Sequence, residues 1–324
     1  MVQATKKKKS LLLHIIETII LLLVVFLIRT FGFGLYQVPT GSMETSMLVG
    51  ERFFADKFSY IFRKPQRLEV ISFNEPPQFY NYSKNPFVNT FQHYVWGPSN
   101  WTKRIIGCPG DEVQGIVEDG KPVIYLNGKK IDEPYLNKYP LIRVWKEDPL
   151  QLQQKIKKQF DILLLSGMDK ENVESLIVQE MCYNTTVKSY DPAKPFNDQP
   201  FYQINPNLIV QGQDGKPDLI WPATPCRSKR IDMRMPTNHN YWDGSDEFYV
   251  KLGPDEYWLM GDNRLGSKDS RYFGPIKERF IHGRILLRIW SIDSDYSWWF
   301  VDLLKHPIDF WRRVRWNRFF QWVN

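Results

Sequence analysis

The chain has 324 residues, of which 43% are hydrophobic, 24% charged and 15% aromatic. This composition excludes a disordered chain, a collagen and a bundle of many membrane spans, and the length allows one large or two ordinary domains. The formal net charge is +7, but Lys6–Lys9 carry four positive charges and residues 305–324 carry a net four more. The middle of the chain is therefore close to neutral. We expect basic tails of this kind to meet lipid phosphates and no nucleic acid.

The first predicted element is a membrane anchor over residues 11–28. This stretch of 18 residues is apolar apart from three side chains. As a helix it would span about 27 Å, close to the roughly 30 Å of bilayer hydrocarbon. A cleaved signal peptide is the alternative, but its apolar part usually has about 7–15 residues before a small-residue cleavage site. Residues 29–36 contain no such site. The lysines before the span place the N-terminus in the cytoplasm and the rest of the chain outside.

Beyond residue 36 the pattern predicts a mainly β protein. Residues 67–73 are a β-rich run, and Asn127-Gly128 within residues 122–130 is a strong signal for a two-residue hairpin. Apolar residues at helical spacing predict helices over 151–165 and 170–181. Both helices fall in a stretch rich in Pro, Asn, Asp and Lys, which we interpret as a lobe inserted into the β-core.

The C-terminal residues 297–324 alternate aromatic and basic side chains. They carry too much charge to span a membrane, but they suit its interface with water. A helix packed against the core is an equally good interpretation of this pattern.

The three cysteines are too few for a disulfide framework, and no Cys-x-x-Cys or histidine cluster predicts a zinc site. Cys182 and Cys226 both fall in the middle lobe and could pair if it lies outside the cytoplasm. We expect Cys108 to pack as a small apolar residue.

Four separated segments combine residue types that can carry chemistry. They are Val38–Met43, which contains Gly-Ser; the run 67–73; Lys103–Asp111, a lysine before a short apolar run and a Pro-Gly turn; and Gly261-Asp262-Asn263-Arg264, continued to Gly274. Taken singly, each pattern is usually structural: a loop serine, a core strand, a surface lysine, and turns with salt bridges.

Together, and in this order after a single apolar span, the segments resemble type I signal peptidase, the membrane-bound serine protease that removes signal peptides from exported proteins. The resemblance covers the anchor and the β-core but not the middle lobe. Two positions depart from the family's pattern. Thr45-Ser46 stand where the family usually has Pro-Thr, and Leu68-Glu69 replace its usual Gly-Asp.

The resemblance implies a Ser-Lys dyad, with Ser42 as nucleophile and Lys103 as general base. A serine hydroxyl is a weak nucleophile without a base, and none of the five histidines lies in a promising context for a triad. The lysine must be neutral to act, so its pKa must fall through burial, and Ile105-Ile106 offer an apolar flank. By the same resemblance, the Thr40 hydroxyl and the Ser42 N–H form the oxyanion hole.

The resemblance also implies supporting residues around the dyad. They are Ser267, expected to hydrogen-bond Lys103; Asp269 and Arg271, expected to form a salt bridge; and Asp262, expected to pair with Arg104. Met43 and Ile105 are candidates for lining shallow pockets that accept small substrate side chains. No metal or cofactor is expected.

The predicted fold is mainly β, with a barrel-like catalytic core, a partly helical lobe and one N-terminal transmembrane helix. We predict a cytoplasmic basic tail (1–10), the anchor (11–28), a catalytic β-core in two parts (36–138 and 247–292), the inserted lobe (139–246) and an aromatic, basic C-terminal tail (293–324). The expected activity is cleavage of preproteins with Ala-x-Ala-type signal peptides at the outer face of a bacterial cytoplasmic membrane.

Three other functions fit the sequence less well. A self-cleaving repressor of the same superfamily would have a DNA-binding domain where this chain has an apolar span. An inactive membrane-anchored binding protein would have no need of Ser42 and Lys103. A membrane-surface adaptor would leave the Lys103 and Gly261–Arg264 segments unexplained. An organellar peptidase of the same family remains an alternative to a bacterial one, although no transit peptide precedes the anchor.

Overall fold

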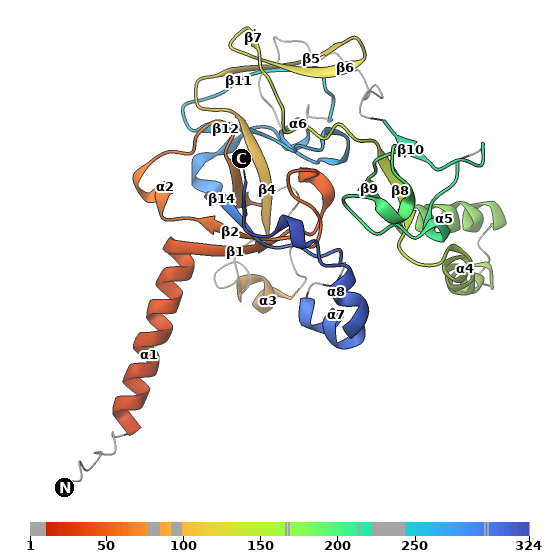
Figure 1. Cartoon of the computed structure of the whole chain (residues 1–324), viewed down its shortest axis with the longest axis horizontal. Coiled ribbons are helices and arrows are strands. Elements are labelled where there is room, and N and C mark those ends of the chain that lie inside the picture. Colours follow the sequence, from red (N-terminus) through yellow and green to blue (C-terminus); the bar gives the residue numbers. More distant parts are fainter. Residues whose placement is uncertain are drawn as a thin grey trace.

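The structure is a computed structural model that describes residues 11–76, 79, 85–91, 99–165, 167, 169–212, 214–221, 244–294, 296 and 298–323. Figure 1 shows a body built mainly of β-sheets, from which one long helix projects.

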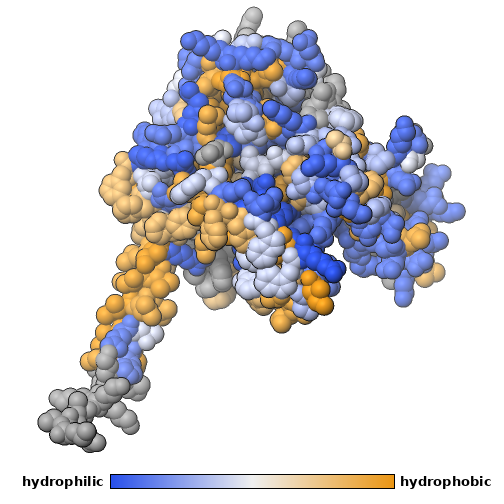
Figure 2. All heavy atoms as spheres, in the orientation of Figure 1, coloured by the Kyte–Doolittle hydropathy of each residue, from blue (hydrophilic) through white to orange (hydrophobic). Residues whose placement is uncertain are grey.

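The projecting helix is α1 (Leu11–Leu27), followed by a π-helical turn at Ile28–Gly32. It confirms the predicted N-terminal apolar helix. The stretch Leu13–Gly32 has a mean hydropathy of 2.3 and is not buried against the body. Within the described residues, it is the one helix long and apolar enough to cross a membrane. Figure 2 shows its apolar side chains exposed along its length.

The central sheet is antiparallel and carries the site. Its strands, in order across the sheet, are β1 (Phe33–Gln37), β2 (Arg52–Asp56), β14 (Ile281–Trp290), β3 (Val70–Asn74), β4 (Asn100–Gly107), β12 (Glu256–Met260) and β13 (Ile276–Lys277), with β15 (Gln321–Trp322) paired to β14. Closure into a barrel is not confirmed among the described strands, because the order ends at β1 and β13 without pairing them. With only two residues, β13 is too short to extend the sheet toward β1.

A second sheet of four strands lies beside the central one (Figure 1). It contains β11 (Phe248–Lys251), β5 (Glu112–Glu118), β6 (Lys121–Leu126) and β7 (Lys129–Lys130). The predicted hairpin joins β6 to β7, and Asn127 (φ 51°) and Gly128 (φ 76°) both have the positive φ that a tight two-residue turn requires. The expected strand at residues 67–73 is β3, which begins at Val70.

The region predicted as an inserted lobe contains a three-stranded sheet and two helices. The strands are β8 (Leu141–Trp145), β9 (Thr185–Ser189) and β10 (Leu219–Ile220). The two predicted helices are confirmed as α4 (Pro149–Leu165) and α5 (Lys170–Tyr183), which pack against each other. Short helices elsewhere are α2 (Ser59–Phe62), α3 (Pro86–Phe91) and α6 (Ser270–Phe273). Of the two cysteines expected to pair, Cys226 lies outside the described residues.

The C-terminal segment has two different faces. It contains α7 (Trp299–Lys305), α8 (Pro307–Arg312) and β15. On the inner face, Phe310, Val314 and Val323 are buried, so the core-packed alternative holds for this face. The outer face exposes large apolar side chains, namely Trp298, Leu304, Ile308, Trp311, Trp316, Phe320 and Trp322.

The loop that follows β1 closes tightly on the start of β2. The Val38 N–H donates to Glu51 O (2.9 Å), and the Gly50 N–H donates to Val38 O (3.1 Å). Gly50 has a φ of +85°, and a Cβ added there would lie 2.0 Å from the Ile292 carbonyl oxygen. Only glycine allows both this backbone conformation and this approach.

We expect Gly50→Ala to lower the free energy of unfolding by more than about 2 kcal/mol, because left-handed strain adds to a backbone clash. Gly128→Ala is the matched control. Its φ is +76°, but a Cβ there meets nothing within 4 Å, so only strain of about 1–2 kcal/mol applies. Urea unfolding in detergent compares the two variants. Equal losses would contradict the close approach at Gly50.

Candidate active site

The proposed nucleophile lies on a short turn between β1 and β2. Gly41–Met43 form one 3₁₀ turn, in which Ser42 and Met43 are buried. Asn263 holds this turn from outside: its N–H donates to Ser42 O (3.2 Å) and its Nδ2 donates to Gly41 O (2.9 Å). The Gly261–Arg264 segment therefore fixes the serine through a residue to which the sequence analysis assigned no role.

Lys103 on β4 reaches this turn. Its Nζ lies 2.8 Å from Ser42 Oγ, in a hydrogen bond between residues 61 positions apart in the chain, and it also donates to Thr102 O (3.0 Å). Both side chains are shielded from water, with Lys103 4% and Ser42 8% exposed. The structure thus brings the two predicted dyad residues into direct contact.

Burial lowers the pKa of Lys103 from 10.5 to about 8. The carboxylates of Asp269 and Asp262 act in the opposite direction, and the nearby Arg271 guanidinium adds to the lowering. Removal of the ammonium from water is the largest of these effects. An amine with a pKa of about 8 can lose its proton at a pH at which proteins remain folded.

Two buried ion pairs fix the strands and the loop around the lysine. Arg104 donates from Nε and Nη2 to the two Asp262 oxygens, each at 2.8 Å, and both side chains are almost fully buried. Arg271 donates from Nε to Asp269 (2.9 Å) and also pairs with Asp246. The two expected pairs are therefore formed. Burial makes each costly to break, because either partner alone would be an uncompensated buried charge.

Ser267 does not make its expected hydrogen bond in this structure. Its Oγ is buried and makes no hydrogen bond to Lys103 within the described part of the chain; it lies instead near Asp269, where it helps to lower the pKa of that carboxyl. It nevertheless lies close to the nucleophile turn. A Cβ added at Gly261 would lie 2.2 Å from Ser267 Oγ and 2.4 Å from Ser42 O. The absence of a side chain at Gly261 therefore allows the Ser267 hydroxyl to lie close to the nucleophile turn. The role of Ser267 in orienting Lys103 stays a prediction.

The two residues proposed to line the substrate pockets lie in different places. Met43 is buried in a cluster with Val38 and Met47 and with residues of β2, β3, β14 and the C-terminal segment. Ile105 is buried in a separate cluster that also contains Ile71, and Cys108 packs against that cluster as predicted. Neither residue lines the two cavities described below, and their role in substrate pockets stays a prediction.

Residues 38–51, between β1 and β2, form the nucleophile loop. The sequence did not predict the groups that hold this loop near Glu51, where it meets β2. Glu51 is fully buried and accepts hydrogen bonds from Arg288 Nε (2.9 Å), Ser291 Oγ (2.8 Å) and Arg318 Nε (2.5 Å). Arg288 and Arg318 also donate to the Ser46 carbonyl oxygen. These partners come from β14 and the C-terminal segment, so no local sequence signal could reveal them.

A second buried carboxylate joins the loop to the lobe. Glu44 accepts hydrogen bonds from the Ser189 N–H (2.9 Å), the Ser189 hydroxyl (2.6 Å) and the Tyr202 hydroxyl. Burial raises the pKa of Glu44, and these donors oppose the rise. Since Glu44 is two residues from Ser42, the lobe contacts the nucleophile turn almost directly.

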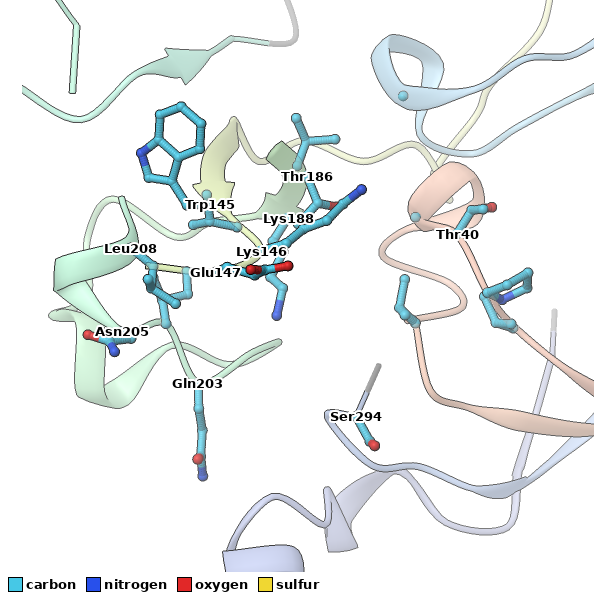
Figure 3. A pocket seen from close by; sticks show the side chains of 18 of the residues that line it. Thr40, Trp145, Lys146, Glu147, Thr186, Lys188, Gln203, Asn205, Leu208 and Ser294 are labelled. Carbon is cyan, nitrogen blue, oxygen red and sulfur yellow. The ribbon is translucent and has the colours of Figure 1, made fainter. Parts of the chain in front are cut away.

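A cavity of about 880 Å³ lies between the segment that precedes Ser42 and the lobe. Figure 3 shows Thr40 on one side of it and Lys188, Thr186 and Lys146 on the other. The predicted oxyanion-hole residue Thr40 is exposed here. No group of three or more His, Cys, Asp or Glu in the described residues is placed to hold a metal ion.

A buried lysine in contact with a serine is the arrangement that a serine hydrolase with a lysine base requires. The family model described as "Signal peptidase, peptidase S26" matches residues 11–190 and 202–290. The chain therefore belongs to the signal peptidase family, peptidase S26.

The chain is also similar to individual proteins and to one solved structure. The signal peptidase I of Buchnera aphidicola subsp. Acyrthosiphon pisum is 24% identical over 92% of this chain and 81% of its own length. That of Aquifex aeolicus is 25% identical over 86% of this chain and 84% of its own length. A crystal structure of a signal peptidase I from Enterococcus faecalis V583 matches with 16% identity and a TM-score of 0.26, covering 69% of this chain and 97% of that one.

Proposed function

We propose that the protein is a membrane-bound serine endopeptidase that cleaves N-terminal signal peptides from exported preproteins with a Ser42–Lys103 dyad. The observation that carries the proposal is the buried contact of 2.8 Å between Lys103 Nζ and Ser42 Oγ. A lysine with its pKa lowered to about 8 can act as the base that serine requires.

In the proposed mechanism, neutral Lys103 takes the proton of the Ser42 hydroxyl as its oxygen attacks the scissile carbonyl carbon. The Ser42 N–H and the Thr40 hydroxyl stabilise the negative charge that develops on the carbonyl oxygen. The Lys103 ammonium then donates its proton to the leaving amine, and the C–N bond breaks. Lys103 next takes a proton from water as the water oxygen attacks the ester carbon. The ester C–Oγ bond then breaks, and the Lys103 ammonium returns this proton to Ser42 Oγ. This step releases the signal peptide and restores the serine hydroxyl and the neutral amine.

The membrane assignment is also a proposal. The anchor α1 ends 15 residues before Ser42, which keeps the nucleophile near the membrane surface where a signal peptide emerges. The lysines before α1 favour a cytoplasmic N-terminus and a catalytic part on the outer side of the cell membrane. The residues at −1 and −3 before the cut would be small, as in Ala-x-Ala. The division into a catalytic core (36–138 and 247–292), a lobe and two tails is proposed on the same basis.

The outer face of the C-terminal segment supports a contact with the bilayer. Its aromatic side chains are exposed next to several arginines, as is typical of membrane interfaces. Further apolar side chains, Leu35 and Phe62, are exposed close to the end of α1. Figure 2 shows apolar surface continuing from α1 onto the adjoining side of the body.

We expect Ser42→Ala and Lys103→Ala each to lower the rate of preprotein cleavage by at least about 10³-fold, and the double variant to be little worse, because the two groups act as one unit. Lys103→Arg is the sharper test, since arginine keeps the positive charge but cannot lose its proton. It should be equally inactive. The exposed Lys121→Ala is the control, and circular dichroism reports folding. Activity of Lys103→Arg near the wild-type level would exclude lysine as the base.

The rate should depend on pH in one direction. Only neutral Lys103 accepts a proton, so kcat/KM should rise about tenfold per pH unit below a pKa of about 8 and level off above it. A short peptide substrate assayed from pH 5 to 9.5 measures this. If kcat/KM does not change over this pH range, the assignment of Lys103 as the base is contradicted.

The exposed aromatic face should bind lipid without the anchor. In a form lacking residues 1–28, changing Trp316, Phe320 and Trp322 to Ser should weaken binding to anionic vesicles by about tenfold or more, and added salt should weaken the remaining binding. The matched control changes three exposed apolar side chains of the lobe, Leu150, Leu165 and Trp221, to Ser. If both triple variants bind equally, the C-terminal face does not meet the membrane.

A further inference from the structure

The cavity beside the nucleophile turn has one wall from the core and one from the lobe. The core wall is the segment Gln37–Gly41, which ends one residue before Ser42. The lobe wall comes from β8, β9 and the residues that follow them. A neighbouring cavity of about 510 Å³ shares Lys188, Gln203, Ile204, Asn205 and Ser294 with it. The two cavities therefore adjoin along these residues, and we treat them together as one groove.

The lobe wall is fastened to the nucleophile turn. Ser189 at the end of β9 and Tyr202 both hydrogen-bond the buried Glu44 carboxylate. Lys188 lies over the Tyr202 ring at 4.7 Å. These buried contacts fix the position of the lobe wall relative to the nucleophile turn.

The size and chemistry of the groove do not suit the small residues that precede the cut. A site that selects alanine must be shallow and apolar, because steric clash is what rejects larger side chains. This groove is large enough for several substrate side chains, and its lobe wall adds polar groups to apolar ones. The polar residues are Lys146, Glu147, Thr186, Lys188 and Asn205, and the apolar ones include Trp145, Val187 and Leu208. The apolar part of a signal peptide must remain in the bilayer. The polar, variable chain is the part that follows the cut.

We propose that this groove binds the first residues of the mature chain, on the C-terminal side of the cut, and that Lys188 makes it favour acidic over basic residues there. The proposal rests on the peptidase function proposed above and assigns a role to the lobe.

The position of Lys188 supports the charge preference. Its side chain is 18% exposed, and Figure 3 shows it pointing across the cavity toward the segment that contains Thr40. Its ion pair with Asp293 is long, at 3.5 Å, and Asp293 is shared with Arg315 at 3.4 Å. Glu147, the acidic residue on the same wall, pairs with Lys155 at 3.7 Å. A partly buried cation acts on a neighbouring charge more strongly than one in open water.

The test uses the full-length enzyme in detergent and peptide pairs that are identical up to the cut and carry either Asp or Lys at the second to fourth positions after it. For the wild type, we expect kcat/KM to be about three- to tenfold higher for the Asp peptides. Lys188→Glu should bring this ratio to one or below. Lys194→Glu makes the same charge change at an exposed lobe position outside the groove, and it should keep the wild-type ratio.

A second variant tests occupancy independently of charge. Two substrates are compared: a peptide with six residues after the cut, and an amide with only a chromogenic leaving group there. Thr186→Trp should fill the groove, so the ratio of kcat/KM for the peptide to kcat/KM for the amide should fall by about tenfold. Thr186→Ala should keep the wild-type ratio. An unchanged ratio in Thr186→Trp would overturn the proposal.

Two further outcomes separate this inference from the peptidase function. If Lys188→Glu alters the response to charges placed before position −3 instead, the groove binds the signal-peptide side and the proposal is overturned. If the wild type cleaves the chromogenic amide but shows no Asp–Lys difference, only this inference fails. If it cleaves neither kind of substrate, the peptidase function itself fails.

Discussion

The site depends on keeping the amine of Lys103 out of water. At a pH below about 8 the buried ammonium is unfavourable by about 3 kcal/mol, from the lowering of its pKa from 10.5 to about 8. This cost fades as the pH rises toward 10.5, because the unfolded chain then also loses the proton. Favourable contacts elsewhere in the fold must offset this cost, and the strand must keep the amine from returning to water. Lys103 sits on a central strand between β3 and β12, where backbone pairing on both sides leaves little room to move away.

Some residues around the dyad change the pKa of Lys103, and others position the turn that carries Ser42. Asp262 and Asp269 raise the pKa of Lys103, yet each is held by an arginine that limits its effect. Arg271 also lowers the pKa directly. The balance leaves desolvation as the dominant influence. The nucleophile turn is positioned separately, by Asn263 on one side and by Glu44 and Glu51 on the other.

The nucleophile loop joins three distant parts of the chain. Glu44 ties it to the lobe, Glu51 to β14 and the C-terminal segment, and Asn263 to the loop after β12. The same C-terminal segment that holds Glu51 exposes Trp316, Phe320 and Trp322 on its other face. Since Arg318 lies between these aromatic residues in sequence, the surface proposed to meet the membrane and one of the groups that hold Glu51 belong to the same segment.

The sequence by itself predicted those helices and turns that are specified by residues close together in the chain. The apolar run at residues 11–28 predicts α1, Asn127-Gly128 predicts its hairpin, and helical spacing predicts α4 and α5, because each signal depends on neighbours within one or two turns. The motifs also identified Ser42 and Lys103 as partners, through the resemblance to a family. Tertiary structure alone decided the rest. The open sheet, the separate clusters of Met43 and Ile105, and the buried Glu44 and Glu51 depend on contacts between residues up to 267 positions apart, which no window of sequence contains.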